Sequence, residues 1–155
     1  MKMLICTDGS KASRKAIEEG SKIANGCSVE EITLIHVYKF ITNYSSLTNG
    51  NMGSISSEDI EKFKEMQEKS KEKTEKEANK ILMDGLELLK EKNIKAETVL
   101  KEGHTSETIT RFAVEKGIDM IVMGSRGRTG LKKLLLGSVS NAVVQEASTN
   151  VLIVK

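Results

Sequence analysis

Short runs of apolar residues, each followed by a turn rich in glycine and serine, constrain the fold more than any other feature of this sequence. Residues 3–6 lead directly into Thr-Asp-Gly-Ser, and residues 118–123, the most apolar run, lead into Gly-Ser-Arg-Gly. A strand that is apolar along almost its whole length is buried on both faces, as in a parallel sheet covered by two layers of helices. We therefore expect a parallel sheet with residues 118–123 as its central strand.

Strand patterns and helix patterns alternate along the chain. Between the apolar runs, apolar residues recur at helical spacing, with Ser10 as a predicted N-cap and Gly117 as a predicted helix end. Strands are predicted over residues 3–6, 31–38, 95–101, 118–123 and 151–154, and helices between Ser10 and Asn25, over 58–92, between 103 and 117, and over 138–147. This order predicts an α/β fold: a single domain over residues 1–155, with a doubly wound, Rossmann-like sheet of five parallel strands and helices on both faces.

Two segments depart from this alternation. Residues 40–57 are rich in Ser, Asn, Thr and Gly without an apolar period, which predicts a long mobile loop. Residues 68–77 are almost wholly charged within a helical period, so we expect a solvated extension of a long helix. Gly85 is the expected place for a bend in that helix.

The charge distribution excludes a general nucleic-acid binder. The formal net charge is +2, from 24 basic and 22 acidic residues that are interleaved along most of the chain. Such binders carry a one-sided basic excess, and here only residues 126–133 are locally basic without any acid. That local cluster indicates a site for an anion rather than a track for a polyanion.

The remaining composition predicts a soluble cytoplasmic protein. We find no charged leader with an apolar core at the start, and no apolar stretch near the roughly 20 residues that a membrane span requires. Cys6 and Cys27 lie far from any CxxC or Cys/His spacing, so both are expected to be reduced thiols. His36 is expected to be packed at a strand end, and His104 to lie at a helix start.

Residues 124–140 carry the chemistry. Gly124 and Gly127 allow a tight turn after the fourth strand, where a side chain would block an approaching ligand. The stretch from Gly137 to Ser140 opens the last helix, so its free N–H groups and the hydroxyls of Ser138 and Ser140 can donate to an anion. Arg126 or Arg128 in the intervening basic loop would neutralise part of the charge of a diphosphate or triphosphate.

The spacing of these residues resembles the glycine signature of ATP-binding universal stress proteins. The signature is reproduced by Gly124, two residues, Gly127, nine residues, Gly137 and Ser138. Residues 5–10, 34–37, 123–125 and 134–140 are similar to further blocks of the family. The resemblance therefore covers essentially the whole chain. It departs at Thr105 and Asn150, where family members often carry proline.

The resemblance implies a set of ligand-binding positions. Asp8 and Val37 would contact adenine or ribose, Gly124, Gly127 and Arg128 would line the path of ribose and phosphates, and Gly137, Ser138, Val139 and Ser140 would hold the phosphates. Thr7 and Met123 lie in matching blocks and complete the expected site. The implied cofactor is ATP, with Mg²⁺ or Mn²⁺ held mainly by the phosphates. The implied assembly is a homodimer through the last strand, residues 151–154.

Two functions remain open at this point. In the first, ATP occupancy sets the conformation of a stress-response regulator or its binding to a protein partner that the sequence does not identify. In the second, the same site is a slow ATPase or phosphotransferase, although residues 124–141 contain no acid to hold a metal or position water. A phosphoacceptor domain would need clustered acids at the strand ends, where only Asp8 is available. The P-loop and GxGxxG motifs are absent.

Overall fold

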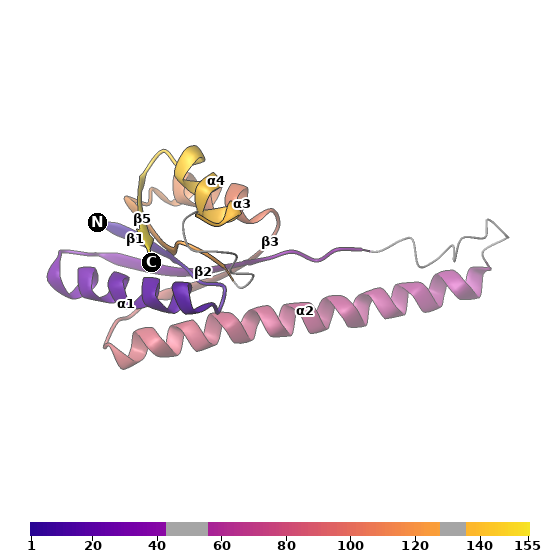
Figure 1. Ribbon diagram of the computed structural model, residues 1–155. Coiled ribbons are helices and arrows are strands. Elements are labelled where there is room, and N and C mark those ends of the chain that lie inside the picture. The colour runs from indigo at the N-terminus through magenta and orange to yellow at the C-terminus, as the bar shows by residue number, and fades with distance from the viewer. Residues whose placement is uncertain (43–55, 128–135) are drawn as a thin grey trace.

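The computed structural model describes residues 1–42, 56–127 and 136–155, and in this part of the chain five parallel strands form one sheet (Figure 1). The strands are β1 (Lys2–Cys6), β2 (Glu31–Tyr38), β3 (Glu97–Glu102), β4 (Met120–Gly124) and β5 (Asn150–Val154). The helices are α1 (Lys11–Gly26), α2 (Ser57–Glu91), α3 (Thr105–Lys116) and α4 (Ser138–Glu146). The predicted α/β fold and the order of its elements are therefore confirmed.

The strand order is β3-β2-β1-β4-β5, so the chain starts in the middle of the sheet and winds outward in both directions. The prediction that residues 118–123 form the central strand is wrong, because β1 holds that place and β4 lies beside it. Both strands are buried along most of their length, and burial alone does not order them. At the carboxyl ends of β1 and β4 the connections leave the sheet in opposite directions, which opens a crevice in folds of this kind.

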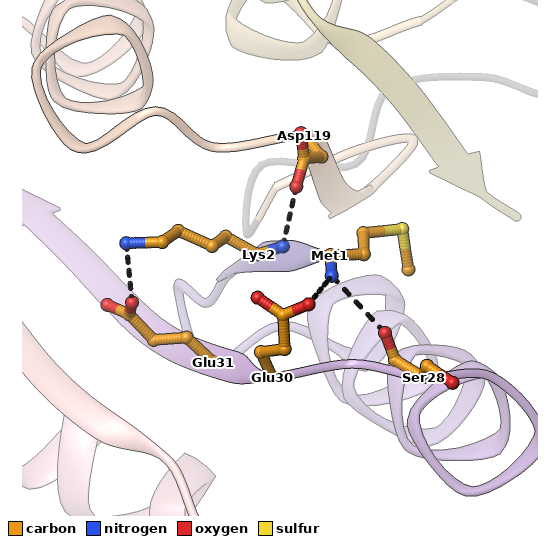
Figure 2. A network of polar contacts seen from close by, with 6 residues as sticks. All are labelled: Met1, Lys2, Ser28, Glu30, Glu31 and Asp119. Carbon is orange, nitrogen blue, oxygen red and sulfur yellow. Dashed lines mark hydrogen bonds and ion pairs between the residues drawn. The ribbon is translucent and has the colours of Figure 1, made fainter.

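Polar contacts at the start of β1 align it with its neighbours (Figure 2). The backbone N–H of Lys2 donates to Oδ2 of Asp119 at 2.7 Å, just before β4. The Lys2 ammonium lies 2.8 Å from the Glu31 carboxylate at the start of β2. The N-terminal amine of Met1 lies 3.1 Å from the carboxylate of Glu30. These exposed ion pairs contribute little stability each, but they agree with the register in which Lys2 pairs with Glu31.

Helices cover both faces of the sheet, as predicted. Figure 1 shows α1 and α2 on one face and α3 and α4 on the other. Alternate residues of the same strands supply the two cores: Met3 and Ile5 of β1 pack with Ile17 and Leu82, whereas Leu4 packs with residues of α3 and α4. The alternation of side chains along each strand thus serves two hydrophobic layers at once.

Helix α2 runs unbroken from Ser57 to Glu91, and its first part projects beyond the sheet (Figure 1). The charged stretch 68–77 is exposed apart from a half-buried Thr74, which confirms the predicted solvated extension. Ile60 and Met66, however, are 42% and 53% exposed rather than part of a buried face. Both lie in the projecting first part of the helix, where Phe63 is buried.

Helix α2 continues through Gly85 without a break, and the lack of a side chain there allows close packing, while a bend at this residue stays a prediction. A Cβ atom there would lie 3.1 Å from Cδ2 of Leu34 and 3.3 Å from Cδ1 of Ile17. The predicted loop over residues 40–57 falls mostly on residues 43–55, which lie outside the described part of the chain. Its mobility therefore stays a prediction. Ser57 itself is the first residue of α2.

Gly124 should be intolerant of any side chain, because α1 crosses directly over the end of β4. A Cβ atom at Gly124 would lie 2.6 Å from the backbone carbon and 2.8 Å from Cβ of Ala12. We expect Gly124→Ala to lower the free energy of unfolding by about 1–3 kcal/mol through overpacking. Gly26→Ala is the matched control, since nothing lies within 4 Å of its added carbon. Urea unfolding of both variants measures the difference, and equal stability would contradict the close approach.

Candidate functional site

A cavity of about 240 Å³ opens at the carboxyl ends of β1 and β4. It lies where the fold opens its crevice, between the turn after β1, the turn after β4 and the first residues of α3 and α4. Its lining residues are Cys6, Thr7, Asp8, Ser13, Ile35, Val37, Thr105, Ile109, Met123, Gly124, Arg126, Gly127, Gly137, Ser138, Val139 and Ser140.

The turn after β1 forms one wall and is held by its own side chains. The Asp8 carboxylate accepts a hydrogen bond from the backbone N–H of Ser10 at 3.0 Å, while Gly9 takes a left-handed backbone angle with φ of +76°. The Ser10 hydroxyl accepts from the N–H of Ser13 at 3.1 Å and so caps α1. Asp8 therefore has a turn-forming role, and its other carboxylate oxygen faces the turn after β4.

The turn after β4 lies against this wall. A Cβ atom at Gly127 would come within 2.8 Å of Oδ2 of Asp8, so only glycine fits here without displacing the carboxylate. The hydroxyl of Ser10 donates to the carbonyl oxygen of Arg126 at 3.4 Å, which ties the two turns together. Gly124 and Gly127 of this turn thus line the cavity with backbone atoms alone.

The start of α4 closes the third side. The N–H of Gly137 donates to the carbonyl oxygen of Ser125 at 2.8 Å. The Ser140 hydroxyl lies 2.9 Å from the same oxygen and 3.0 Å from the carbonyl oxygen of Gly137. Ser140 is 2% exposed. The single proton of its hydroxyl is therefore donated within the protein in this structure, where Ser140 joins α4 to the turn after β4. Donation from this hydroxyl to an anion stays a prediction.

The first turn of α4 has no side-chain cap among the described residues. Its N-cap is Gly137, and the N–H groups of Ser138, Val139 and Ser140 belong to the positions that have no acceptor within a helix. Together with the positive end of the helix dipole, these groups favour an anion at this end of the cavity. Among the described residues that line the cavity, Arg126 is basic and Asp8 is acidic.

The other end of the cavity is apolar. Ile35 and Val37 of β2, Ile109 of α3 and Met123 of β4 line it, together with Cys6. Burial raises the pKa of the Cys6 thiol to about 12, with a smaller contribution from the Asp8 carboxylate. The thiol is therefore neutral at ordinary pH and belongs to the apolar wall rather than to any nucleophilic chemistry.

The structure brings together every predicted site residue that it describes. Thr7, Asp8, Val37, Met123, Gly124, Gly127 and the stretch from Gly137 to Ser140 all line this cavity, whereas Arg128 lies outside the described residues. His36 is buried, with Nδ1 at 2.7 Å from the carbonyl oxygen of Thr7, and His104 is the N-cap of α3, as expected.

Sequence reasoning missed five lining residues: Cys6, Ser13, Ile35, Thr105 and Ile109. One carried a usable signal, because Ile35 lies two residues before Val37 on a strand and therefore on the same face. Thr105 and Ile109 became part of the site only when α3 packed beside β2. Arg126, which the sequence offered as an alternative to Arg128, also lines the cavity.

The described residues hold neither a metal cluster nor a membrane-spanning helix. They contain no group of three or more His, Cys, Asp or Glu side chains that could hold a metal ion. Nor does any described helix combine the length and apolar character needed to cross a membrane.

Comparisons with known proteins agree on one family. The model of the "Universal stress protein family" matches residues 1–155. Universal stress protein YxiE of Bacillus subtilis is 36% identical over 155 residues, covering 99% of this chain and 98% of its own. The solved structure of protein MJ0577 from Methanocaldococcus jannaschii is similar with a TM-score of 0.76 and 27% identity, covering 99% of this chain and 94% of that one.

A more distant structure comes from Arabidopsis thaliana and contains AMP. That universal stress protein family member has a TM-score of 0.62 and 17% identity, and the match covers 100% of this chain and 91% of that one. At this identity the likeness shows the shared fold.

Cys6 should resist alkylation while the protein is folded, because its thiol is buried and its pKa is raised. With iodoacetamide in mildly alkaline buffer, we expect label on the exposed Cys27 alone. Peptide mass spectrometry locates the label, and the Cys27→Ser variant should stay unlabelled until denaturant is added. Rapid labelling of native Cys27→Ser protein would contradict the buried position of Cys6.

Proposed function

The chain belongs to the universal stress protein family, and from that premise we propose that it is an ATP-binding regulator of the stress response. One observation carries the proposal: three backbone segments that each contain glycine converge on a cavity with an apolar end and an anion-favouring end. A nucleotide has the same division, with a flat base at one end and charged phosphates at the other. Solved relatives of the same fold are described with AMP, dAMP and cAMP.

The phosphates would lie between the turn after β4 and the start of α4. There the N–H groups of Ser138, Val139 and Ser140 face the anion, and Gly127 leaves the backbone open to it. Arg126 supplies positive charge from the same turn. The site residues fit a nucleotide because all three features serve a chain of phosphates, and the base would then occupy the apolar end beside Val37.

A divalent cation such as Mg²⁺ or Mn²⁺ would be held mainly by the phosphates. Asp8 is the acidic residue among those lining the cavity, and one of its oxygens already accepts from Ser10. Such a setting gives a metal few protein ligands and gives an attacking water no dedicated base. We therefore favour a regulator over an ATPase, with the bound nucleotide joining the turns after β1 and β4 to helix α4.

The proposal also includes a homodimer through β5. This strand pairs with β4 on one side, and no described strand pairs with its other side. Val151, Leu152 and Ile153 are half-buried in the single chain. An unpaired, apolar edge of this kind favours pairing with another chain.

Nucleotide affinity tests the site directly. By titration calorimetry we expect ATP to bind better than AMP or GTP. Ser138→Glu and Gly127→Glu should each weaken ATP binding by roughly tenfold or more, through like-charge repulsion and steric block. Ser148→Glu, an exposed position beyond the far end of α4, adds the same charge as a control and should bind like the parent.

Two results would contradict the proposal. Failure of the parent protein to bind any adenine nucleotide would refute the function. Binding that is equal in the parent and in Ser138→Glu would refute the site while leaving nucleotide binding itself intact.

The state of assembly tests the role of β5. By sedimentation equilibrium we expect twice the chain mass of 17.0 kDa. The carbonyl oxygen of Val154 accepts a hydrogen bond from the N–H of Ser125, so the backbone groups of Val154 point toward β4. Because these groups alternate in direction along a strand, the N–H of Val151, three residues earlier, points to the open edge. Val151→Pro should therefore keep the pairing with β4 and give the mass of one chain. A parent protein that stays monomeric at high concentration, or a folded variant that stays dimeric, would contradict the dimer.

A further inference from the structure

One side chain on the apolar wall of the cavity carries a hydroxyl group, and sequence reasoning did not include it. Thr105 is the first residue of α3 and lines the cavity together with Ile109, four residues later on the same helix face. Val37 at the end of β2 lines the same region. Thr105 therefore lies where the base, rather than the phosphates, would bind.

The turn before α3 fixes the position of Thr105. The N–H of Gly103 donates to the carbonyl oxygen of Tyr38 at 2.9 Å and so ties the turn to the end of β2. Gly103 has a φ of +156°, and a Cβ atom there would lie 2.7 Å from Oγ1 of Thr108. The N–H of Thr108 in turn donates to the carbonyl oxygen of His104 at 2.9 Å. The first residue of α3 thus has little freedom to move away from the cavity.

Other polar groups near this wall are already engaged within the protein. The Thr7 hydroxyl accepts from the N–H of Gly9 at 3.4 Å and donates to the Ser13 hydroxyl at 3.5 Å. The Ser13 hydroxyl donates to the carbonyl oxygen of Ser10 at 3.0 Å. The Cys6 thiol is a weak donor. Thr105 lines the cavity and is half-buried, and its hydroxyl has no hydrogen-bond partner within the described part of the chain.

We propose that Thr105 is a specificity-determining residue whose hydroxyl forms a hydrogen bond with the polar edge of the bound nucleobase, an inference that rests on the proposed function. A base that enters an apolar pocket loses the water bound to its ring nitrogens and exocyclic group. A hydroxyl can replace that water as either donor or acceptor. The wall of Val37 and Ile109 holds the base plane, and Thr105 recovers the lost polar contact.

This placement distinguishes Thr105 from the residues at the phosphate end. Removing its hydroxyl should weaken ATP and AMP binding by a similar factor, because both ligands carry the same base. Inorganic tripolyphosphate, which has no base, should bind the parent and the variant equally. Loss of a contact at the phosphate end would instead weaken the binding of tripolyphosphate as well as that of ATP and AMP.

Thr105→Val removes the hydroxyl at nearly constant volume, and Thr105→Ser keeps it. By titration calorimetry we expect Thr105→Val to weaken ATP and AMP binding by roughly tenfold and Thr105→Ser to stay within about twofold of the parent. Thr110→Val is the matched control, because it makes the same change on the same helix. The Thr110 hydroxyl already donates to the carbonyl oxygen of Ser106 at 3.1 Å. Thermal unfolding checks that each variant is folded.

The outcomes separate this inference from the function beneath it. Unchanged ATP binding by folded Thr105→Val, or an equal loss of tripolyphosphate binding, would overturn the role of Thr105 and leave nucleotide binding in place. A parent protein that binds no nucleotide would overturn both.

Discussion

The carbonyl oxygen of Ser125 accepts hydrogen bonds from two groups at the start of α4, and the shape of the site depends on this junction. The N–H of Gly137 lies 2.8 Å from that oxygen and the Ser140 hydroxyl 2.9 Å from it. A Cβ atom at Gly137 would lie 3.4 Å from the Cα of Arg126, so the two segments touch along their backbones. The donors at the start of α4 are thereby held against the turn that leaves β4.

The sheet places this junction opposite the turn after β1. Because β1 and β4 are parallel neighbours, their carboxyl ends meet at one edge and their connections diverge. Ser10 bonds to the carbonyl oxygen of Arg126, and Asp8 faces Gly127, so the crevice has two polar walls and an apolar end made by β2 and α3. That combination suits a ligand with a flat apolar part and several negative charges, which is the basis of the proposed nucleotide site.

Much of this could be predicted from sequence, for identifiable physical reasons. Buried parallel strands give continuous apolar runs, so the strands could be predicted from the sequence. Glycines at fixed spacing mark where backbone approaches backbone, so the convergence of Gly124, Gly127 and Gly137 could be predicted as well. The order of β1 and β4 in the sheet could not be predicted, since both strands are buried on two faces. The role of Gly85 depends on how closely α2 approaches Leu34, and the engaged hydroxyl of Ser140 and the cavity wall at Thr105 depend on contacts between distant segments.

Capture of the phosphates by the first turn of α4 is the central claim, and amide chemical shifts in a ¹⁵N-labelled sample test it most directly. On addition of ATP, the amide resonances of Ser138, Val139, Ser140 and Gly127 should move the most. Those of Gly117 and Thr149, which line a separate hollow, should stay in place. Large shifts at Gly117 and Thr149 with none at the start of α4 would contradict the claim.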